Sequence, residues 1–303
     1  MELRLRLATR ASKLALAQSK WVAAQITERH PGVRVELVTV TTRGDAVQDR
    51  ALSKVGGKGL FTKEIEDALL CGGADLAVHS LKDLPTALPE GLTLGAICGA
   101  EDARDVLVSR NDQRFEALPS GAAVGTSSLR RQAQLRHARP DLTFVDIRGN
   151  VDTRLRKLAE GEVDALILAG AGLARLGLAD RISQWLRTKL CLPAVGQGLL
   201  AVEIRSDDVE TAALLRPLHD EAAATRAEAE RSALACLGGG CHTPVGVHAT
   251  VSGDAVSVEG VVAGPSGEPY YRAAEAAPRH EAAAAGERLA QRLKAMGAGT
   301  LLG

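Results

Sequence analysis

The spacing of apolar and polar residues predicts alternating strands and helices at the start of the chain. Leu3, Leu5 and Leu7 alternate with charged residues, which is typical of a strand with one buried face. An amphipathic pattern over residues 13–28 predicts a helix, and Pro31 and Gly32 end it. Similar patterns predict a helix at 60–71 and strands at 33–41, 74–79 and 92–98. This alternation indicates an α/β domain.

A second α/β region begins near residue 105 and resembles the first. A strand at 122–124 runs into the hydroxyl-rich turn 125–128 and then a helix, just as the first strand runs into residues 8–12. Residues 67–78 and 156–167 also match in helix, glycine and strand positions. We interpret this as a weak internal duplication. Because ligands of open α/β sheets bind at the carboxyl ends of strands, we expect the two halves to face each other across a cleft.

The last third of the chain has a different pattern. Residues 192–198 predict a hinge-like turn, and a strand at 199–204 is expected to return to the first domain. Helices are predicted at 208–219, 221–236 and 279–296, and strands at 245–251, 255–263 and 269–276. The expected fold class is α/β, with two domains like those of periplasmic solute-binding proteins and a small C-terminal α+β domain. The expected domains are residues 1–98 with 199–217, residues 103–193, and residues 220–303.

Charge and composition reduce the range of functions that the chain can have. The 303 residues carry 37 basic and 37 acidic side chains, so no net field attracts nucleic acid or a membrane. Aromatic residues make up 2% of the chain, which argues against base-stacking surfaces. Nine basic residues are Lys and 28 are Arg, a residue suited to carboxylates, although high genomic GC content also favours Arg. The apolar runs are too short to span a membrane, and we expect a cytoplasmic protein.

The five cysteines, an odd number, are not expected to form a disulfide framework. Cys71, Cys98 and Cys191 stand among apolar or strand-like residues and are expected to be small core residues. Cys236 and Cys241 form a lone C-x4-C with only His242 beside it, so a zinc site is not favoured, and we expect no metal. Cys241 follows three glycines, whose ordering is entropically costly and suggests either close approach to a ligand or a backbone with positive φ.

Several arginines stand at predicted strand ends or in first helical turns, the places that face a ligand in such folds: Arg10, Arg130, Arg131, Arg148, Arg154 and Arg175. A surface ion pair is the ordinary alternative for any one of them. Hydroxyls beside them, at Ser12, Thr126, Ser127 and Ser128, are either helix caps or anion ligands. Together they indicate a small polyanionic ligand. Residues 54–59 do not match a phosphate-binding P-loop, which disfavours phosphate transfer.

Asp83 is the most suggestive carboxylate. It lies between Lys82 and Pro85, on a loop that leaves a predicted strand. An acid in that position can stabilise positive charge on a substrate, whereas an isolated Asp in a turn is more often an ordinary surface residue.

Taken together, these motifs resemble the porphobilinogen deaminase (hydroxymethylbilane synthase) family. The resemblance rests on residues in all three expected domains: Ala8-Thr9-Arg10, Thr42-Arg43-Gly44-Asp45, the segments 54–61, 77–83, 124–131 and 192–198, Arg148-Gly149-Asn150-Val151, and Gly239-Gly240-Cys241. Lys13 stands where many relatives have Pro, and Gly238 where an acidic residue is common. These departures concern local geometry at the first helix and the Cys241 loop.

The resemblance implies an enzyme that carries a dipyrromethane cofactor on Cys241 through a thioether. Four porphobilinogen units are added to it, each losing ammonia to give an electrophilic azafulvene, and water then releases the linear tetrapyrrole. Asp83 would hold pyrrole N–H groups and stabilise the cationic intermediates. The arginines would neutralise the acetate and propionate groups of the pyrroles.

The resemblance also implies individual binding residues. Those expected at the cofactor are Cys241, Lys82, Ser80, Asp83, Thr126, Ser128, Arg130, Arg131, Arg148, Gly149 and Lys58. Those expected at the substrate are Arg10, Ser12, Arg148, Arg154, Arg175 and Gln18. The enzyme is expected to be a monomer without nucleic-acid or membrane partners. The alternative is a bilobal anion-binding or effector-sensing protein without catalysis, which would not need a thiol on a glycine loop.

Overall fold

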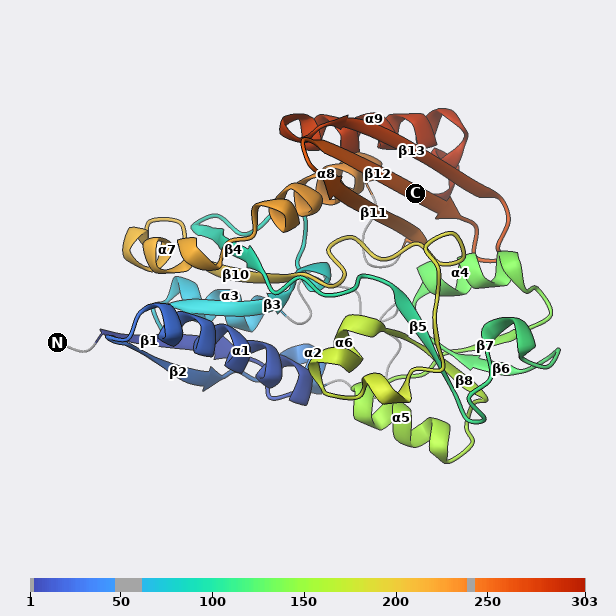
Figure 1. The fold of residues 1–303 in the computed structure, drawn as a ribbon, viewed down its shortest axis with the longest axis horizontal. Helices are drawn as coiled ribbons and strands as arrows, with labels where there is room; N and C mark the ends of the chain where they lie inside the picture. Colours follow the sequence, from blue (N-terminus) through green and yellow to red (C-terminus); the bar gives the residue numbers. More distant parts are fainter. Residues whose placement is uncertain (1–2, 47–61, 239–242, 303) are drawn as a thin grey trace. The chain divides into compact units, whose positions relative to one another are not determined.

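The computed structural model describes residues 3–46, 62–238 and 243–302. The chain forms two compact units, which we call unit 1 and unit 2. Unit 1 comprises Met1–Ala100 and Leu199–Ala224, and unit 2 comprises Glu101–Gly198 and Thr225–Gly303. Figure 1 shows the helices and strands of each unit.

Unit 1 is built on a five-stranded sheet. Its strand order is β2 (Val33–Thr39), β1 (Leu3–Thr9), β3 (Leu76–Ser80), β10 (Leu200–Arg205) and β4 (Leu92–Cys98). Strand β1 is parallel to β2 and β3, whereas β10 is antiparallel to both β3 and β4. The prediction that the strand after residue 199 returns to the first domain is therefore confirmed.

Helices cover both faces of this sheet because successive strand residues point to opposite sides. Leu7 packs on the face covered by α1 (Lys13–Arg29), and its neighbour Ala8 packs on the face covered by α3 (Lys63–Leu70). The shorter elements of unit 1 are α2 (Arg43–Ala46), η1 (Leu81–Asp83), α7 (Val209–Leu215) and η4 (Arg216–Leu218).

The first sheet of unit 2 repeats the plan of unit 1. Its order is β7 (Thr143–Val145), β6 (Ala123–Gly125), β8 (Ala165–Ala169), β5 (Asp105–Ser109) and β9 (Gln184–Trp185). The first three strands are again parallel, and β5 is antiparallel to its neighbours. Gly72 and Gly161, at φ +72° and +83°, occupy matching places between helix and strand, where a left-handed residue is needed. The shared plan supports the internal duplication.

The remaining elements of this part of unit 2 are α4 (Leu129–Ala138), α5 (Val151–Ala159), α6 (Gly170–Arg175), η2 (Phe115–Ala117) and η3 (Ala179–Arg181). The helices follow β6, β7 and β8 in the chain. Each helix therefore begins just after the carboxyl end of a strand.

A second sheet in unit 2 is antiparallel and has its own hydrophobic core. Its order is β11 (Val245–Ser252), β12 (Ala255–Ala263) and β13 (Tyr270–Pro278), with α8 (Glu221–Leu237), η5 (Arg279–Glu281), α9 (Ala282–Ala295) and η6 (Ala298–Leu301). Val247, Val258 and Leu289 belong to its core. Helices α8 and α9 pack so closely that a Cβ at Gly286 would overlap the Ala229 carbonyl oxygen. The three sheets confirm the predicted fold class.

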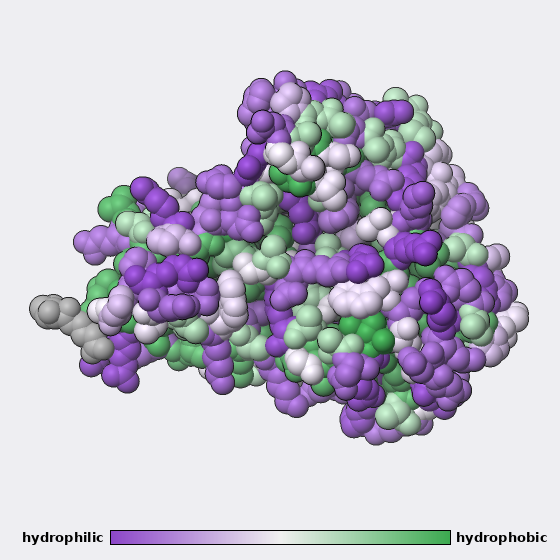
Figure 2. All heavy atoms as spheres, viewed as in Figure 1, coloured by the Kyte–Doolittle hydropathy of each residue, from purple (hydrophilic) through white to green (hydrophobic). Residues whose placement is uncertain are grey.

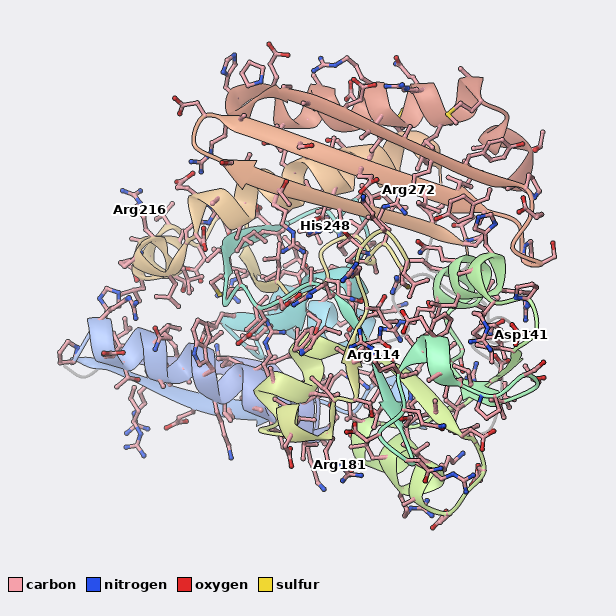
Figure 3. The ribbon with its side chains drawn as sticks, turned by 45° about the vertical axis from the view of Figure 1, so that its right-hand side comes forward. Arg114, Asp141, Arg181, Arg216, His248 and Arg272 are labelled. Atoms are coloured by element: carbon pink, nitrogen blue, oxygen red, sulfur yellow. The ribbon has the colours of Figure 1, made fainter. Side chains whose placement is uncertain are left out.

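Direct contacts join the two sheets of unit 2. Arg272, labelled in Figure 3, donates from Nη2 to the Thr188 carbonyl oxygen at 3.1 Å and from Nη1 to that of Lys189 at 2.9 Å. Ala133 of α4 packs with Val261 of β12. These contacts explain why residues 101–198 and 225–303 form one compact unit, and the division of the chain into three domains stays a prediction.

Burial of the cysteines agrees with expectation at two of three positions. Cys98 and Cys191 are buried, whereas Cys71 is exposed. The prediction for Cys71 was wrong because α3 ends at Leu70 and Cys71 caps its exposed end.

Polar and apolar residues are interspersed over the face shown in Figure 2. Within the described part of the chain, none of the helices combines the length and apolarity that crossing a membrane requires.

Candidate active site

The candidate site of unit 1 lies at the turn that follows β3. Strand β3 ends at Ser80 and continues into η1, where the buried Leu81 donates its N–H to the Leu199 carbonyl oxygen at 3.0 Å. This bond and the buried Leu81 side chain hold the backbone of the turn. Asp83, at the end of η1, is exposed. The turn therefore presents a carboxylate to solvent from a fixed backbone.

Five predicted site residues of unit 1 line one hollow: Arg10, Ser12, Gln18, Ser80 and Asp83. The hollow encloses about 440 Å³, including space open to solvent. Gln18 Nε2 donates to Ser80 Oγ at 2.9 Å, which connects α1 to the end of β3. The structure thus brings the expected substrate residues Arg10, Ser12 and Gln18 together with Asp83. Lys82 is half-buried on the same turn.

Polar contacts at the start of α1 position Arg10 and Ser12. Ser19 Oγ donates to Thr9 Oγ1 at 2.8 Å inside the protein, which fixes the helix to the end of β1. Ser12 is the N-cap, and its Oγ accepts from the Ala15 N–H at 3.3 Å. Ser12 therefore serves as an ordinary helix cap and also lines the hollow.

In unit 2 the hydroxyl-rich turn before α4 is rigid. Ser128 caps α4 by accepting from the Arg131 N–H at 3.5 Å. Thr126 is fully buried, and its Oγ1 accepts from the Ser128 N–H at 3.3 Å. Ser127 Oγ donates to the Ile147 carbonyl oxygen at 2.8 Å. The hydroxyls of this turn are thus held in place by the backbone around them.

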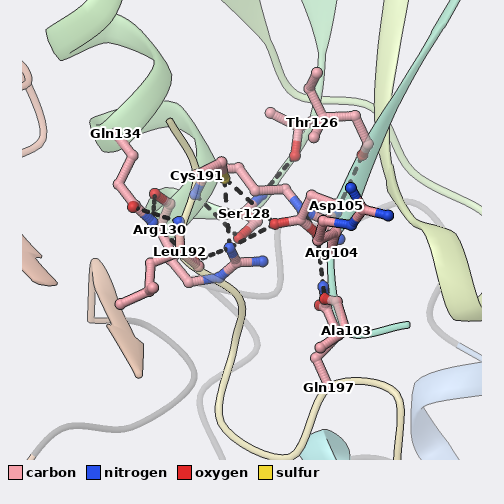
Figure 4. A network of polar contacts seen from close by, with 12 residues as sticks. Ala103, Arg104, Asp105, Thr126, Ser128, Arg130, Gln134, Cys191, Leu192 and Gln197 are labelled. Carbon is pink, nitrogen blue, oxygen red and sulfur yellow. Dashed lines mark hydrogen bonds and ion pairs between the residues drawn. The ribbon is translucent and has the colours of Figure 1, made fainter. Parts of the chain in front are cut away.

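The two arginines that follow are buried against a carboxylate that sequence reasoning missed (Figure 4). Arg130 Nη1 donates to Asp105 Oδ2 at 2.6 Å, and Arg131 Nε and Nη2 donate to Asp105 Oδ1 at 3.0 and 2.7 Å. Burial alone would raise the pKa of Asp105, but the two guanidinium charges outweigh it and hold that pKa well below its usual range. Asp105 is therefore a carboxylate that fixes both arginines.

Further contacts complete this network around Asp105. Gln197 Nε2 donates to Asp105 Oδ1 at 2.8 Å, and the Cys191 thiol donates to Oδ2 at 3.3 Å. Burial, reinforced by the Asp105 charge, raises the pKa of Cys191 to about 12, so the thiol keeps its proton. Arg130 Nη1 also donates to the Leu192 carbonyl oxygen at 2.6 Å. The network thus joins β5 and α4 to the segment 191–197.

Arg154 lies near two other positively charged side chains, those of Arg131 and Arg148. Burial, together with the charges of Arg131 and Arg148, lowers the pKa of Arg154 to about 10. Its Nε donates to the Gly149 carbonyl oxygen at 2.8 Å. Gly149 has φ +108°, and a Cβ there would lie 2.6 Å from Thr153 Cγ2, so glycine is required. No acidic group acts appreciably on Arg154 among the described residues, and this arrangement suits an added anion.

The other predicted site residues are placed differently. Arg175 is in α6, and its Nη2 donates to the Gly198 carbonyl oxygen at 2.7 Å, at the end of the segment that precedes β10. Cys241 and Lys58 lie outside the described residues. In the part of the chain that the structure describes, His, Cys, Asp and Glu side chains form no group of three that could hold a metal.

Each of the two α/β sheets has hydroxyls and arginines at the starts of its helices, an arrangement that suits binding of a small polyanion. The family model "Porphobilinogen deaminase, dipyromethane cofactor binding domain" matches residues 5–213, and "Porphobilinogen deaminase, C-terminal domain" matches residues 224–295. The porphobilinogen deaminase of Syntrophotalea carbinolica is 51% identical over 298 residues, covering 98% of this chain and 95% of its own. That of Pelotomaculum thermopropionicum is 50% identical and covers 97% and 94%. The chain belongs to the porphobilinogen deaminase family.

This membership confirms the resemblance inferred from the motifs. It also supports an enzyme over the non-catalytic binder, because both relatives are named as deaminases.

Among solved structures, the methionine-binding protein MetQ has a TM-score of 0.45 at 12% identity, covering 71% of this chain and 88% of its own. A putative methionine-binding lipoprotein from Bacillus subtilis has a TM-score of 0.42 at 12% identity, with 72% and 90% covered.

Proposed function

We propose that this chain joins four porphobilinogen molecules head to tail, with loss of ammonia, and releases hydroxymethylbilane by hydrolysis. The chain is a transferase of porphyrin biosynthesis by its family. Two observations carry the assignment of residues: an exposed carboxylate lines the hollow of unit 1, and in unit 2 no acidic group among the described residues acts appreciably on Arg154. Such a protein can bind carboxylated pyrroles and stabilise positive charge on them.

The residues of unit 2 fit a dipyrromethane cofactor. This group, when bound through Cys241, supplies the pyrrole end to which substrate units are added. Its carboxylates need several cations, and Arg154, which lies near the charges of Arg131 and Arg148, has no acidic group acting appreciably on it among the described residues. Ser128 and the backbone at Gly149 would provide further donors. The proposed set of cofactor-binding residues also includes Thr126 and Arg130 of unit 2, and Lys58 of the segment before α3.

Asp83 is the proposed catalytic residue. Its carboxylate shares the unit 1 hollow with Arg10, Ser12 and Gln18, which would bind the acetate and propionate of the substrate. From this position Asp83 would accept a pyrrole N–H and stabilise the positive charge that develops as the amine leaves. Ser80 and Lys82 on the same turn would help to hold the cofactor. Arg175 would bind the growing chain.

Two further points follow from the same proposal. The absence of a spanning helix among the described residues fits an enzyme that acts in the cytoplasm. The proposed site residues all come from one chain, so a monomer would suffice for activity.

Intact-mass measurement of the purified protein tests the attachment site. The wild-type chain should carry the added mass of a dipyrromethane, and Cys241→Ser should have the mass of the bare chain. Cys71→Ser is the matched control because Cys71 is an exposed thiol outside the proposed site, and it should retain the added mass. An adduct that persists in Cys241→Ser would contradict the attachment.

A further inference from the structure

A buried group of ionisable side chains adjoins the hollow that contains Asp83. His79 of β3 and Glu203 of β10 project from the same face of the sheet, and His79 Nε2 lies 3.0 Å from Glu203 Oε2. The side chain of His79 is 4% exposed and that of Glu203 is 0% exposed. Glu66 of α3 is also buried, and it lies close enough to both groups for their charges to act on it. His79 and Thr62, at the start of α3, line the hollow.

These side chains have hydrogen-bonding capacity that the described residues do not use. His79 Nε2, both carboxylate oxygens of Glu203, Glu66 Oε1 and Thr62 Oγ1 are buried without a hydrogen-bond partner there. The approach of His79 Nε2 to Glu203 Oε2 is therefore close but not aligned as a hydrogen bond. An unsatisfied buried acid is costly, so such a group is rarely retained for stability alone.

The charges around Glu66 favour a retained proton. Burial raises the pKa of Glu66, and the Glu203 carboxylate and exposed Asp67 raise it further, while the Thr62 hydroxyl and His79 oppose this. Among the residues that the structure describes, Arg10 and Asp83 are the other charged groups that line the hollow. Two buried carboxyl groups beside one imidazole cannot all be charged without a net negative charge in the core. The group can therefore hold a proton at the wall of the hollow.

We propose that His79 donates a proton to the departing amine of the substrate, and that Glu203 and Glu66 hold His79 in place and restore its proton. This proposal rests on the proposed function. In the step, the bond between the aminomethyl carbon and nitrogen breaks, and the nitrogen keeps the electron pair. The nitrogen takes a proton from His79 and leaves as ammonia, and the carbon keeps the positive charge that Asp83 stabilises. Glu66 or solvent then returns a proton to the imidazole.

Arg10 gives a physical reason for such a donor. A cation that binds substrate carboxylates also opposes the ammonium form of the substrate amine nearby. A proton donor at the wall of the hollow lets the amine bind uncharged and leave as neutral ammonia. General acids of this kind contribute roughly 10²–10⁴-fold to a rate.

The test compares His79→Gln, Glu203→Gln and Glu66→Gln with wild-type holoenzyme. We expect kcat for porphobilinogen to fall by about 10²-fold in His79→Gln and less in the two Glu variants, with KM little changed. The alkaline limb of the pH profile of kcat should disappear in His79→Gln, because no donor remains to be titrated. Intact mass should show the cofactor still attached. Glu28→Gln, an exposed carboxylate on α1, is the control.

A substrate analogue with a trimethylammonium leaving group separates a proton donor from a structural residue. This leaving group departs without a proton, so wild type and His79→Gln should process the analogue at the same rate. Equal loss on both substrates, or an unchanged pH profile with porphobilinogen, would overturn the proposal. Wild-type protein that does not consume porphobilinogen would instead overturn the proposed function.

Discussion

Replacement of Asp105 by Asn should destabilise the protein far more than an ordinary Asp substitution. Asp105 is fully buried and receives bonds of 2.6 and 2.7 Å from Arg130 and Arg131. The variant leaves two buried guanidinium groups without a counter-charge, and it turns an amide N–H₂ toward one of these donors. Removing one partner of a buried ion pair costs about 3–5 kcal/mol. With an unfolding entropy of about 2.1 cal/mol/K per residue, that corresponds to a fall in Tm of about 5–8 °C for this chain.

The assay is thermal unfolding followed by circular dichroism between pH 5 and 8. A carboxyl whose folded pKa is depressed stabilises the protein above its unfolded pKa of about 3.9 and loses this effect only as the pH falls through the folded value. Because Asp105 has such a depressed pKa, the difference from wild type should be constant across this range. Intact mass would show whether the variant also fails to assemble the cofactor.

Asp102→Asn is the matched control. Asp102 lies only three positions before Asp105 in the chain. It pairs with Arg104 at 2.6 Å, but both side chains are more than a third exposed. Exposed pairs contribute about 0–1 kcal/mol. A Tm for Asp105→Asn that equals the Tm of Asp102→Asn would refute the inference that Asp105 holds the arginines in place.

Two further predictions concern single residues of the site. Gly149→Ala should destabilise unit 2 by about 1–3 kcal/mol and reduce cofactor retention by intact mass, because φ is +108° and the new Cβ would lie 2.6 Å from Thr153. Gly121→Ala, at φ +80° with no atom within 4 Å, should show a smaller loss, and equal losses would contradict the steric argument. Glu66→Gln should gain stability relative to wild type as the pH rises, since the raised pKa of Glu66 means that folding binds a proton between its unfolded and folded values. Denaturant midpoints at pH 4 and pH 8 measure this, and a constant difference would show that Glu66 ionises as easily in the folded protein as in the unfolded chain.

Much of the fold could be predicted because hydrophobic periodicity is local information. The predicted strands at 92–98 and 255–263 coincide with β4 and β12. The predicted helix at 208–219 instead divides into α7 and η4, because Pro217 lacks the N–H that a continuing α-helix needs. The predicted helix at 279–296 begins as the 3₁₀ turn η5 before α9.

The site was less predictable because its contacts join residues distant in the chain. The positions of Arg10, Ser12, Gln18, Ser80 and Asp83 at strand and helix ends predicted their grouping, and they line one hollow. The Asp105 contacts could not be predicted, since 25 residues separate it from Arg130. The available signal was an acid at the first position of an otherwise apolar strand.

The buried pair of His79 and Glu203 was missed for a related reason. Both residues stand in runs that read as ordinary strands, and only the pairing of β3 with β10 brings them to one face. Glu203 comes from the segment that returns to unit 1 after residues 101–198. A local pattern of apolar and polar residues does not show which distant strand will pair with a given strand.

Turnover of porphobilinogen by Asp83→Asn tests the central assignment most directly. Asp83 is exposed, so the variant should keep the fold and the attached cofactor, as circular dichroism and intact mass would show. Loss of one preorganised electrostatic group should lower kcat by about 10²–10³-fold. Asp207→Asn, an exposed carboxylate elsewhere in unit 1, should turn over like wild type. Normal turnover by Asp83→Asn with its cofactor in place would contradict the assignment of Asp83 as the catalytic residue.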